Sequence, residues 1–68
     1  MRNQLLQLLR NSASNQLDSE SIMLYFLNQG YKRKQTAGAI GNARRQGYIS
    51  VAGKQYCASR NKMVNVFM

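Results

Sequence analysis

Residues 35–49, QTAGAIGNARRQGYI, decide the fold because the hydrophobic period changes within them. Up to Gly47 the spacing is helical: with Ile40 facing inward at 100° per residue, Thr36 and Ala43 fall beside it. After Gly47, β-branched and aromatic residues alternate, which is typical of strands. We therefore predict a helix that runs directly into an antiparallel sheet. Either the helix includes the basic residues 32–34, or it begins at Thr36 as N-cap and leaves residues 32–35 in a turn.

Two helices are predicted before this stretch. Leucines spaced three and four apart in LLQLL predict an amphipathic helix over residues 2–11. In LDSESIMLYFL, Asp18 is the expected N-cap, and Leu17 is expected to pack on Ile22 as a hydrophobic staple. Gly30 is the expected left-handed residue at the end of this second helix. Its predicted buried face consists of Ile22, Met23, Phe26 and Leu27.

Three short strands are predicted after the third helix, near residues 48–51, 55–58 and 63–67. They are separated by the turn-like sequences GK and SRNK. The expected core-facing residues are Ile49, Val51, Val64 and Val66. The fold class is accordingly α+β, with three helices followed by a small antiparallel hairpin or sheet, and 68 residues allow one domain over 1–68.

Composition limits the chemistry of this chain. One Cys excludes an internal disulfide, and the absence of His together with only two acidic residues argues against a structural zinc site and against acid–base catalysis. We therefore expect no enzyme activity, no cofactor, no metal and no small-molecule substrate. The longest apolar run, residues 22–27, is far shorter than a membrane span, so the expected location is the cytoplasm, without membrane contact.

Positive charge is the strongest signal for a partner. Ten Lys and Arg residues against two acids give a net charge of +8. The two halves differ sharply: residues 1–30 are neutral, whereas residues 31–68 carry eight basic residues and no acid. A basic half without acids indicates a polyanionic partner.

Two glycines inside the third helix add to this signal. Gly38 and Gly41 each cost roughly 1 kcal/mol relative to Ala in a helix interior. Such residues in a small domain indicate either a close approach to another backbone or an outer face that lies tightly against a ligand.

The order of three helices and a hairpin, with LLQLL, LDSESIMLYFL and the junction RRQGYI, resembles the winged helix-turn-helix domain of small bacterial and phage regulators. This resemblance implies a transcription regulator that binds double-stranded DNA, with the third helix in the major groove and the hairpin against the backbone. Gln35 and Asn42 are then the expected contacts to adenine, Arg45 contacts either a guanine or a phosphate, and Gly38 lets the helix approach closely. The full set of candidate DNA-binding residues is Lys32, Arg33, Lys34, Gln35, Thr36, Gly38, Asn42, Arg45, Lys54, Arg60 and Lys62.

Two other functions stay open at this point. The same fold can bind an acidic protein surface, for example as a phage modulator of a host complex, or it can bind RNA through its tyrosines and basic residues. A homodimer is a further option, either through the leucines of the first helix or through the edge of the last strand, MVNVFM.

Overall fold

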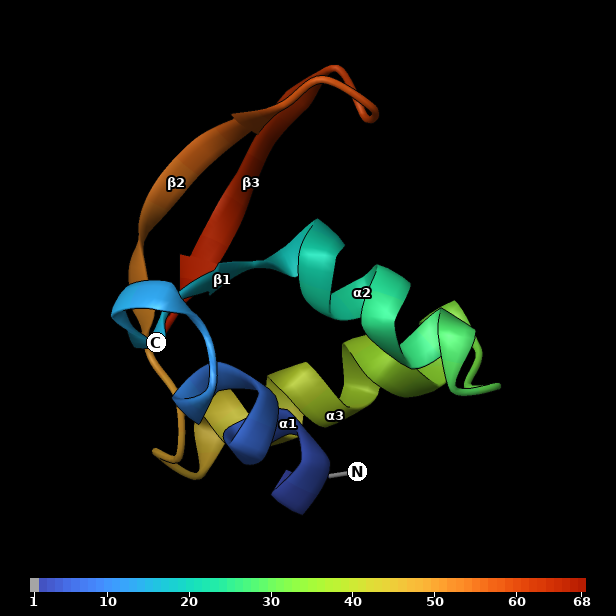
Figure 1. The fold of residues 1–68 in the computed structure, drawn as a ribbon, viewed down its shortest axis with the longest axis vertical. Helices are drawn as coiled ribbons and strands as arrows, with labels where there is room; N and C mark the ends of the chain where they lie inside the picture. The colour runs from blue at the N-terminus through green and yellow to red at the C-terminus, as the bar shows by residue number, and fades with distance from the viewer. Residues whose placement is uncertain (1) are drawn as a thin grey trace.

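The computed structural model describes residues 2–68 and shows an α+β fold (Figure 1). Three helices pack with a three-stranded antiparallel sheet of order β1-β3-β2. The first strand lies between the first two helices in sequence, and the other two strands follow the third helix. The elements are α1 (Arg2–Arg10), the short 3-10 helix η1 (Ala13–Asn15), β1 (Leu17–Asp18), α2 (Ser19–Asn28), α3 (Arg33–Arg45), β2 (Val51–Cys57) and β3 (Lys62–Phe67).

Local signals in the sequence set both ends of α2. Asp18 is the N-cap, as predicted: its carboxylate accepts a hydrogen bond from the backbone N–H of Ser21 at 3.2 Å and another from the Ser21 hydroxyl at 2.6 Å. At the other end, Gly30 takes the left-handed conformation with φ +94°, also as predicted. Tyr31 N–H then bonds the carbonyl of Phe26 at 3.0 Å, which closes the helix.

Helix α3 includes the basic residues at its start. Lys32 is the N-cap, and its backbone N–H donates to the Gln35 side-chain oxygen at 2.9 Å. The alternative in which the helix begins at Thr36 is therefore wrong. Gly47, with φ +82°, ends the helix in the way that Gly30 ends α2.

One hydrophobic core joins the three helices to the sheet. It consists of Leu5, Leu9, Ile22, Phe26, Ile40, Ala43, Ile49 and Phe67, with Leu17 packed against it from β1. The predicted buried face of α2 was too wide: Leu27 is 37% exposed and Met23 only half-buried. The reason is that α2 lies at the surface of the molecule, so only its Ile22–Phe26 side meets the core.

The strands differ from the prediction. Residues 48–50 lie outside the strands, and there is no turn at the predicted GK: Gly53 and Lys54 pair with Val66 and Asn65 inside one continuous strand β2. A β-bulge just before them, between Val51 and Gly53, places an extra residue in β2 and shifts which of its side chains face inward. Val51 is accordingly exposed rather than buried. In the neighbouring segments Val66 is only half-buried, whereas Ile49 and Val64 are buried as predicted.

Strand β1 was not predicted. Its two residues pair with the end of β3, Leu17 opposite Phe67 and Asp18 opposite Val66. Because β1 leads directly into α2, this pairing attaches the β2–β3 hairpin to the helices. It also places β3 in the middle of the sheet, so the edge that was predicted to be free along the last strand is covered at Val66 and Phe67 and open only over residues 62–65.

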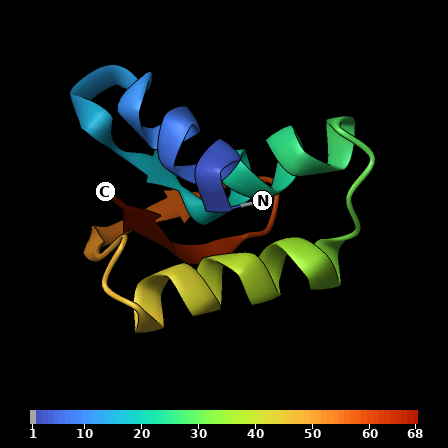
Figure 2. The same cartoon turned by 90° about the horizontal axis from the view of Figure 1, so that it is seen from below.

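The helices lie on two sides of the molecule (Figure 2). Helices α1 and α2 form one side, and α3 forms the opposite side. In Figure 1 the hairpin extends away from α3 and its turn lies near the start of α2. Among residues 2–68, no helix combines the length and the apolar character that crossing a bilayer requires.

Candidate functional site

The outward side of α3 carries a row of exposed residues on successive turns. Lys34, Gly38, Asn42 and Arg45, which we call the α3 outer stripe, are all exposed, whereas Thr36, Ile40 and Ala43 on the other side are buried. Within the described residues, the side chains of Lys34, Asn42 and Arg45 take part in no hydrogen bond or ion pair. Their donors and acceptors are thus available to a ligand.

The two glycines of α3 face open space. A Cβ atom added to Gly38 or to Gly41 would meet nothing within 4 Å outside the helix itself. Close packing against another part of this chain therefore does not explain them. Of the two explanations that the sequence suggested, the structure contradicts a close approach to another backbone among the described residues, and a tight fit to a ligand stays a prediction.

A second group of basic residues surrounds a hollow of about 320 Å³ between the starts of α2 and α3 and the hairpin. We call it the basic hollow. Four cations from three elements line it, together with Ser19 and Glu20 from α2. The cations are Arg33, Lys54, Arg60 and Lys62, all of which the sequence analysis named separately.

Glu20 holds two of these cations in place. One carboxylate oxygen accepts a hydrogen bond from Arg33 Nη2 at 2.9 Å, and the other lies 3.5 Å from Arg60 Nη1. The Glu20 side chain is only 12% exposed, so this carboxylate is shielded from water better than most surface acids. One carboxylate facing four cations leaves the hollow with a formal charge of +3, which favours an anion.

Several candidate residues have other surroundings than expected. Thr36 is fully buried, and its hydroxyl donates to the Lys32 carbonyl at 3.1 Å. Its side chain therefore faces the core and belongs neither to the α3 outer stripe nor to the basic hollow. The Gln35 side-chain oxygen is used by the helix N-cap, which leaves only its amide nitrogen for a ligand. Lys54 lies within β2, opposite Asn65 of β3, and not in a turn. Lys32 is exposed at the N-cap of α3. In sequence it directly precedes Arg33 of the basic hollow and Lys34 of the α3 outer stripe.

The sequence analysis missed the role of Glu20. Both acids of the chain lie at the start of α2, where negative charge complements the helix dipole. Asp18 is the N-cap there, but Glu20 also links α2 to α3 and to the hairpin turn. A usable signal existed, because an acid in a chain with only two acids and ten cations is expected to attract several cations.

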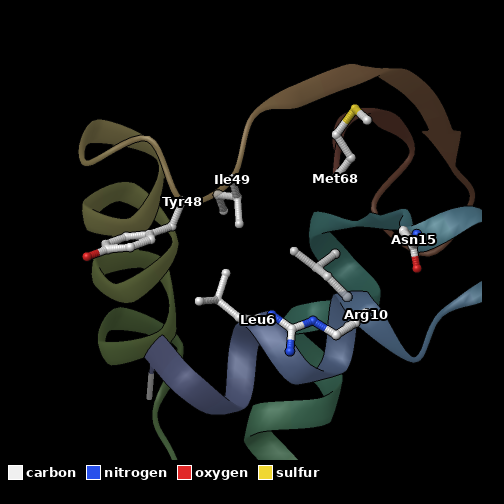
Figure 3. Close-up of a pocket in the computed structure, with 7 residues that line it drawn as sticks. Leu6, Arg10, Asn15, Tyr48, Ile49 and Met68 are labelled. Atoms are coloured by element: carbon white, nitrogen blue, oxygen red, sulfur yellow. The ribbon is translucent and has the colours of Figure 1, made fainter.

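A different, mostly apolar hollow lies on the other side of the molecule (Figure 3). Its volume is about 240 Å³, and it lies between α1, η1 and the segments that carry Ile49 and Met68. Arg10 is its one cation, and Figure 3 shows Arg10 and Leu6 on the side of α1 facing Tyr48 and Met68. This hollow is smaller than the ~300–1,000 Å³ of ordinary ligand sites, and it is separate from the basic hollow and from the α3 outer stripe.

Comparison with models of protein families, with curated proteins and with solved structures finds no match for this chain. Among residues 2–68, no three acidic or thiol side chains lie close enough to hold a metal ion. The geometry and charge of the α3 outer stripe and the basic hollow are therefore the basis for a functional proposal.

Proposed function

We propose that this protein is a winged helix-turn-helix domain that reads a sequence in double-stranded DNA and acts as a small transcription regulator. In this proposal α3 enters the major groove and the β2–β3 hairpin is the wing. The α+β architecture supports the assignment, since α2 and α3 are joined by a short turn and a hairpin follows α3 directly.

The open face of α3 is the observation that carries the proposal. An α-helix is about 10–12 Å across with its side chains, and the major groove is about 12 Å wide, so a helix fits the groove, and its backbone comes closest to the bases where its outer side chains are small. Gly38 and Gly41 provide such a place, with no contact inside the chain to explain them. Lys34 and Arg45 flank this part of the helix and are free to reach phosphates or base edges on either side.

Asn42 is the residue best placed to read a base. It is exposed on the α3 outer stripe, carries no charge and has no partner among the described residues. An Asn amide pairs with adenine N6 and N7 through two hydrogen bonds, which identifies one base pair among four. Arg45, three residues further along the same face, is suited to guanine or to a phosphate.

The basic hollow is proposed to hold the DNA backbone. Phosphate contacts set position and supply much of the affinity without reading sequence. Four cations around one hollow suit this role, with the hairpin supplying Lys54, Arg60 and Lys62, and α3 supplying Arg33.

Selection of bound molecules from random DNA duplexes at near-physiological salt tests the proposal. The expected result is an enriched sequence motif. Affinity for that motif should fall with salt on a log–log slope of about −5 if six of the candidate cations contact phosphate. A slope shallower than about −2, or a pool without enrichment, contradicts it. If no motif is enriched, binding assays with single-stranded RNA and with acidic proteins show which of these two other partner classes the protein binds.

A further inference from the structure

A group of described residues on the side of the molecule opposite α3 carries no charge. We call it the α1–α2 face, and it consists of exposed and half-buried residues of α1, of α2 and of the position just after α1: Gln4, Gln7, Leu8, Asn11, Leu24, Tyr25 and Asn28. Leu24 is 52% exposed and Tyr25 is 36% exposed. A hollow of about 300 Å³ lies between the two helices, lined by three residues of α1, by Asn11 just after it and by Tyr25.

The structure directs the charges of the N-terminal half away from this face. Arg2 lies over the ring of Tyr48, 4.8 Å from its centroid, and hydrogen-bonds its hydroxyl at 3.3 Å. Arg10 lines the apolar hollow of Figure 3, and Glu20 faces the basic hollow. What remains on the α1–α2 face is a leucine and a tyrosine bordered by uncharged amides.

Other routes to self-association are less favourable. The α1 leucines Leu5 and Leu9 are buried in the core, and the outer edge of β3 is open only over residues 62–65, which line the basic hollow. The edge of β2 is open along its length, but β2 carries Lys54 and leads into a turn containing Arg60. Pairing two such edges would bring like charges together, which is destabilising.

We propose that a second copy of this chain docks on the α1–α2 face to form a symmetric dimer. In a two-fold interface each patch meets its own copy, so a patch of one charge repels itself. Among the described surfaces, this face avoids that repulsion in a chain of net charge +8. Amide side chains both donate and accept hydrogen bonds, so Gln and Asn can pair with their own copies, and the hollow has room for a leucine side chain such as Leu24 of the second copy.

This arrangement leaves both α3 helices exposed. Figure 2 shows α3 on the side away from α1 and α2, so a dimer through the α1–α2 face keeps the basic surfaces free. A standard interface covers roughly 800 Å² per partner, about a sixth of the 4613 Å² surface of this chain. Two helices of nine and ten residues give a smaller contact than that, and we expect a weak dimer that forms at micromolar or higher protein concentration.

Sedimentation velocity of the full chain without DNA tests this proposal, so its outcome does not depend on the proposed function. The wild-type protein should form dimers as its concentration rises. Leu24→Lys should raise the dimer dissociation constant at least about tenfold, because each new charge meets its own copy. Met63→Lys is the matched control: Met63 is 54% exposed in β3, receives the same charge and should leave dimerisation unchanged. Gln7→Lys tests the same face from α1 if Leu24→Lys does not fold.

Salt gives an independent readout. Added salt screens the repulsion between two chains of charge +8, so dimerisation through an uncharged face should become stronger. A wild-type protein that stays monomeric up to millimolar concentration overturns the proposal. So does equal weakening by Leu24→Lys and Met63→Lys, or a dimer that dissociates when salt is added.

Discussion

Two residues of opposite kind have separate parts in the proposed binding of DNA by the α3 outer stripe and the basic hollow. Asn42 has no charge and lies free on the α3 outer stripe, so its proposed part is to read a base. Glu20 is largely shielded and binds Arg33 and Arg60, so it lowers the positive charge of the basic hollow. Substitution of Asn42 therefore tests base recognition, and substitution of Glu20 tests phosphate binding.

Asn42→Ala is expected to weaken binding to the selected motif by roughly 1–3 kcal/mol and to relax preference at one base pair, because it removes a two-bond contact. Binding to random duplex should barely change. Lys34→Ala is the comparison: it should weaken all sequences alike and reduce the salt slope by about 1. Competition titrations with motif and random duplexes measure both. Equal loss on both duplexes for Asn42→Ala would show that this residue does not read a base.

Glu20→Gln is expected to strengthen binding to random duplex and to make the salt slope steeper by about 1–2, since two arginines become available to phosphates. Asp18→Asn is the matched control, because it changes the net charge equally and keeps a good N-cap but forms no ion pair. Salt titrations of DNA binding by the wild type, Glu20→Gln and Asp18→Asn measure these slopes. Equal effects of the two variants would mean that net charge alone, and not release of Arg33 and Arg60, accounts for the gain.

At the scale of the element, α3 combines poor helix-forming residues with an open outer face. Its N-cap is a lysine whose backbone is held by Gln35, and its interior contains two glycines that touch nothing. Three basic residues at the helix start oppose the helix dipole. These features reduce stability, and the proposed contact with DNA gives a common physical reason for them.

Gly38→Ala should therefore stabilise the protein by about 1 kcal/mol while weakening its binding to the selected motif. The added Cβ meets nothing in the free protein but lies where the groove would be. Urea unfolding and motif titration measure the two effects. Gly41→Ala, nearer the side of the stripe, should give a similar gain in stability with a smaller loss of binding. If Gly38→Ala stabilises the protein and leaves binding intact, close approach to DNA is not the reason for the glycine.

At the scale of the whole molecule, a single small core carries the stability. Phe26 is fully buried at its centre, and its ring meets Tyr31 edge-on at 5.6 Å between centroids. The same core joins α2, α3 and the hairpin through Ile40, Ile49 and Phe67. The relative positions of the α3 outer stripe and the basic hollow depend on this core.

Phe26→Ala is expected to lower the free energy of unfolding by about 3–5 kcal/mol, because it leaves a cavity that the neighbouring side chains fill only in part. In a domain of 68 residues this loss is comparable to the whole stability. Thermal unfolding followed by circular dichroism measures it. Leu27→Ala, on the exposed side of the same helix, should have a much smaller effect, and similar losses from both variants would contradict the observed core.

The sequence by itself determined what depends on near neighbours along the chain. Asp18 at the start of α2, Gly30 and Gly47 at two helix ends, and the inward side of α3 all follow from local hydrogen bonding, backbone freedom and helical period. The basic residues of the candidate site were also evident, because charge is a property of composition. Tertiary structure alone decided the rest. Pairing of β1 with β3, the bulge in β2 next to the exposed Val51, and the meeting of Arg33 and Arg60 at Glu20 all involve residues far apart in sequence. Such contacts depend on how the elements pack around Phe26. The spacing of residues within one element does not determine how that element packs against another.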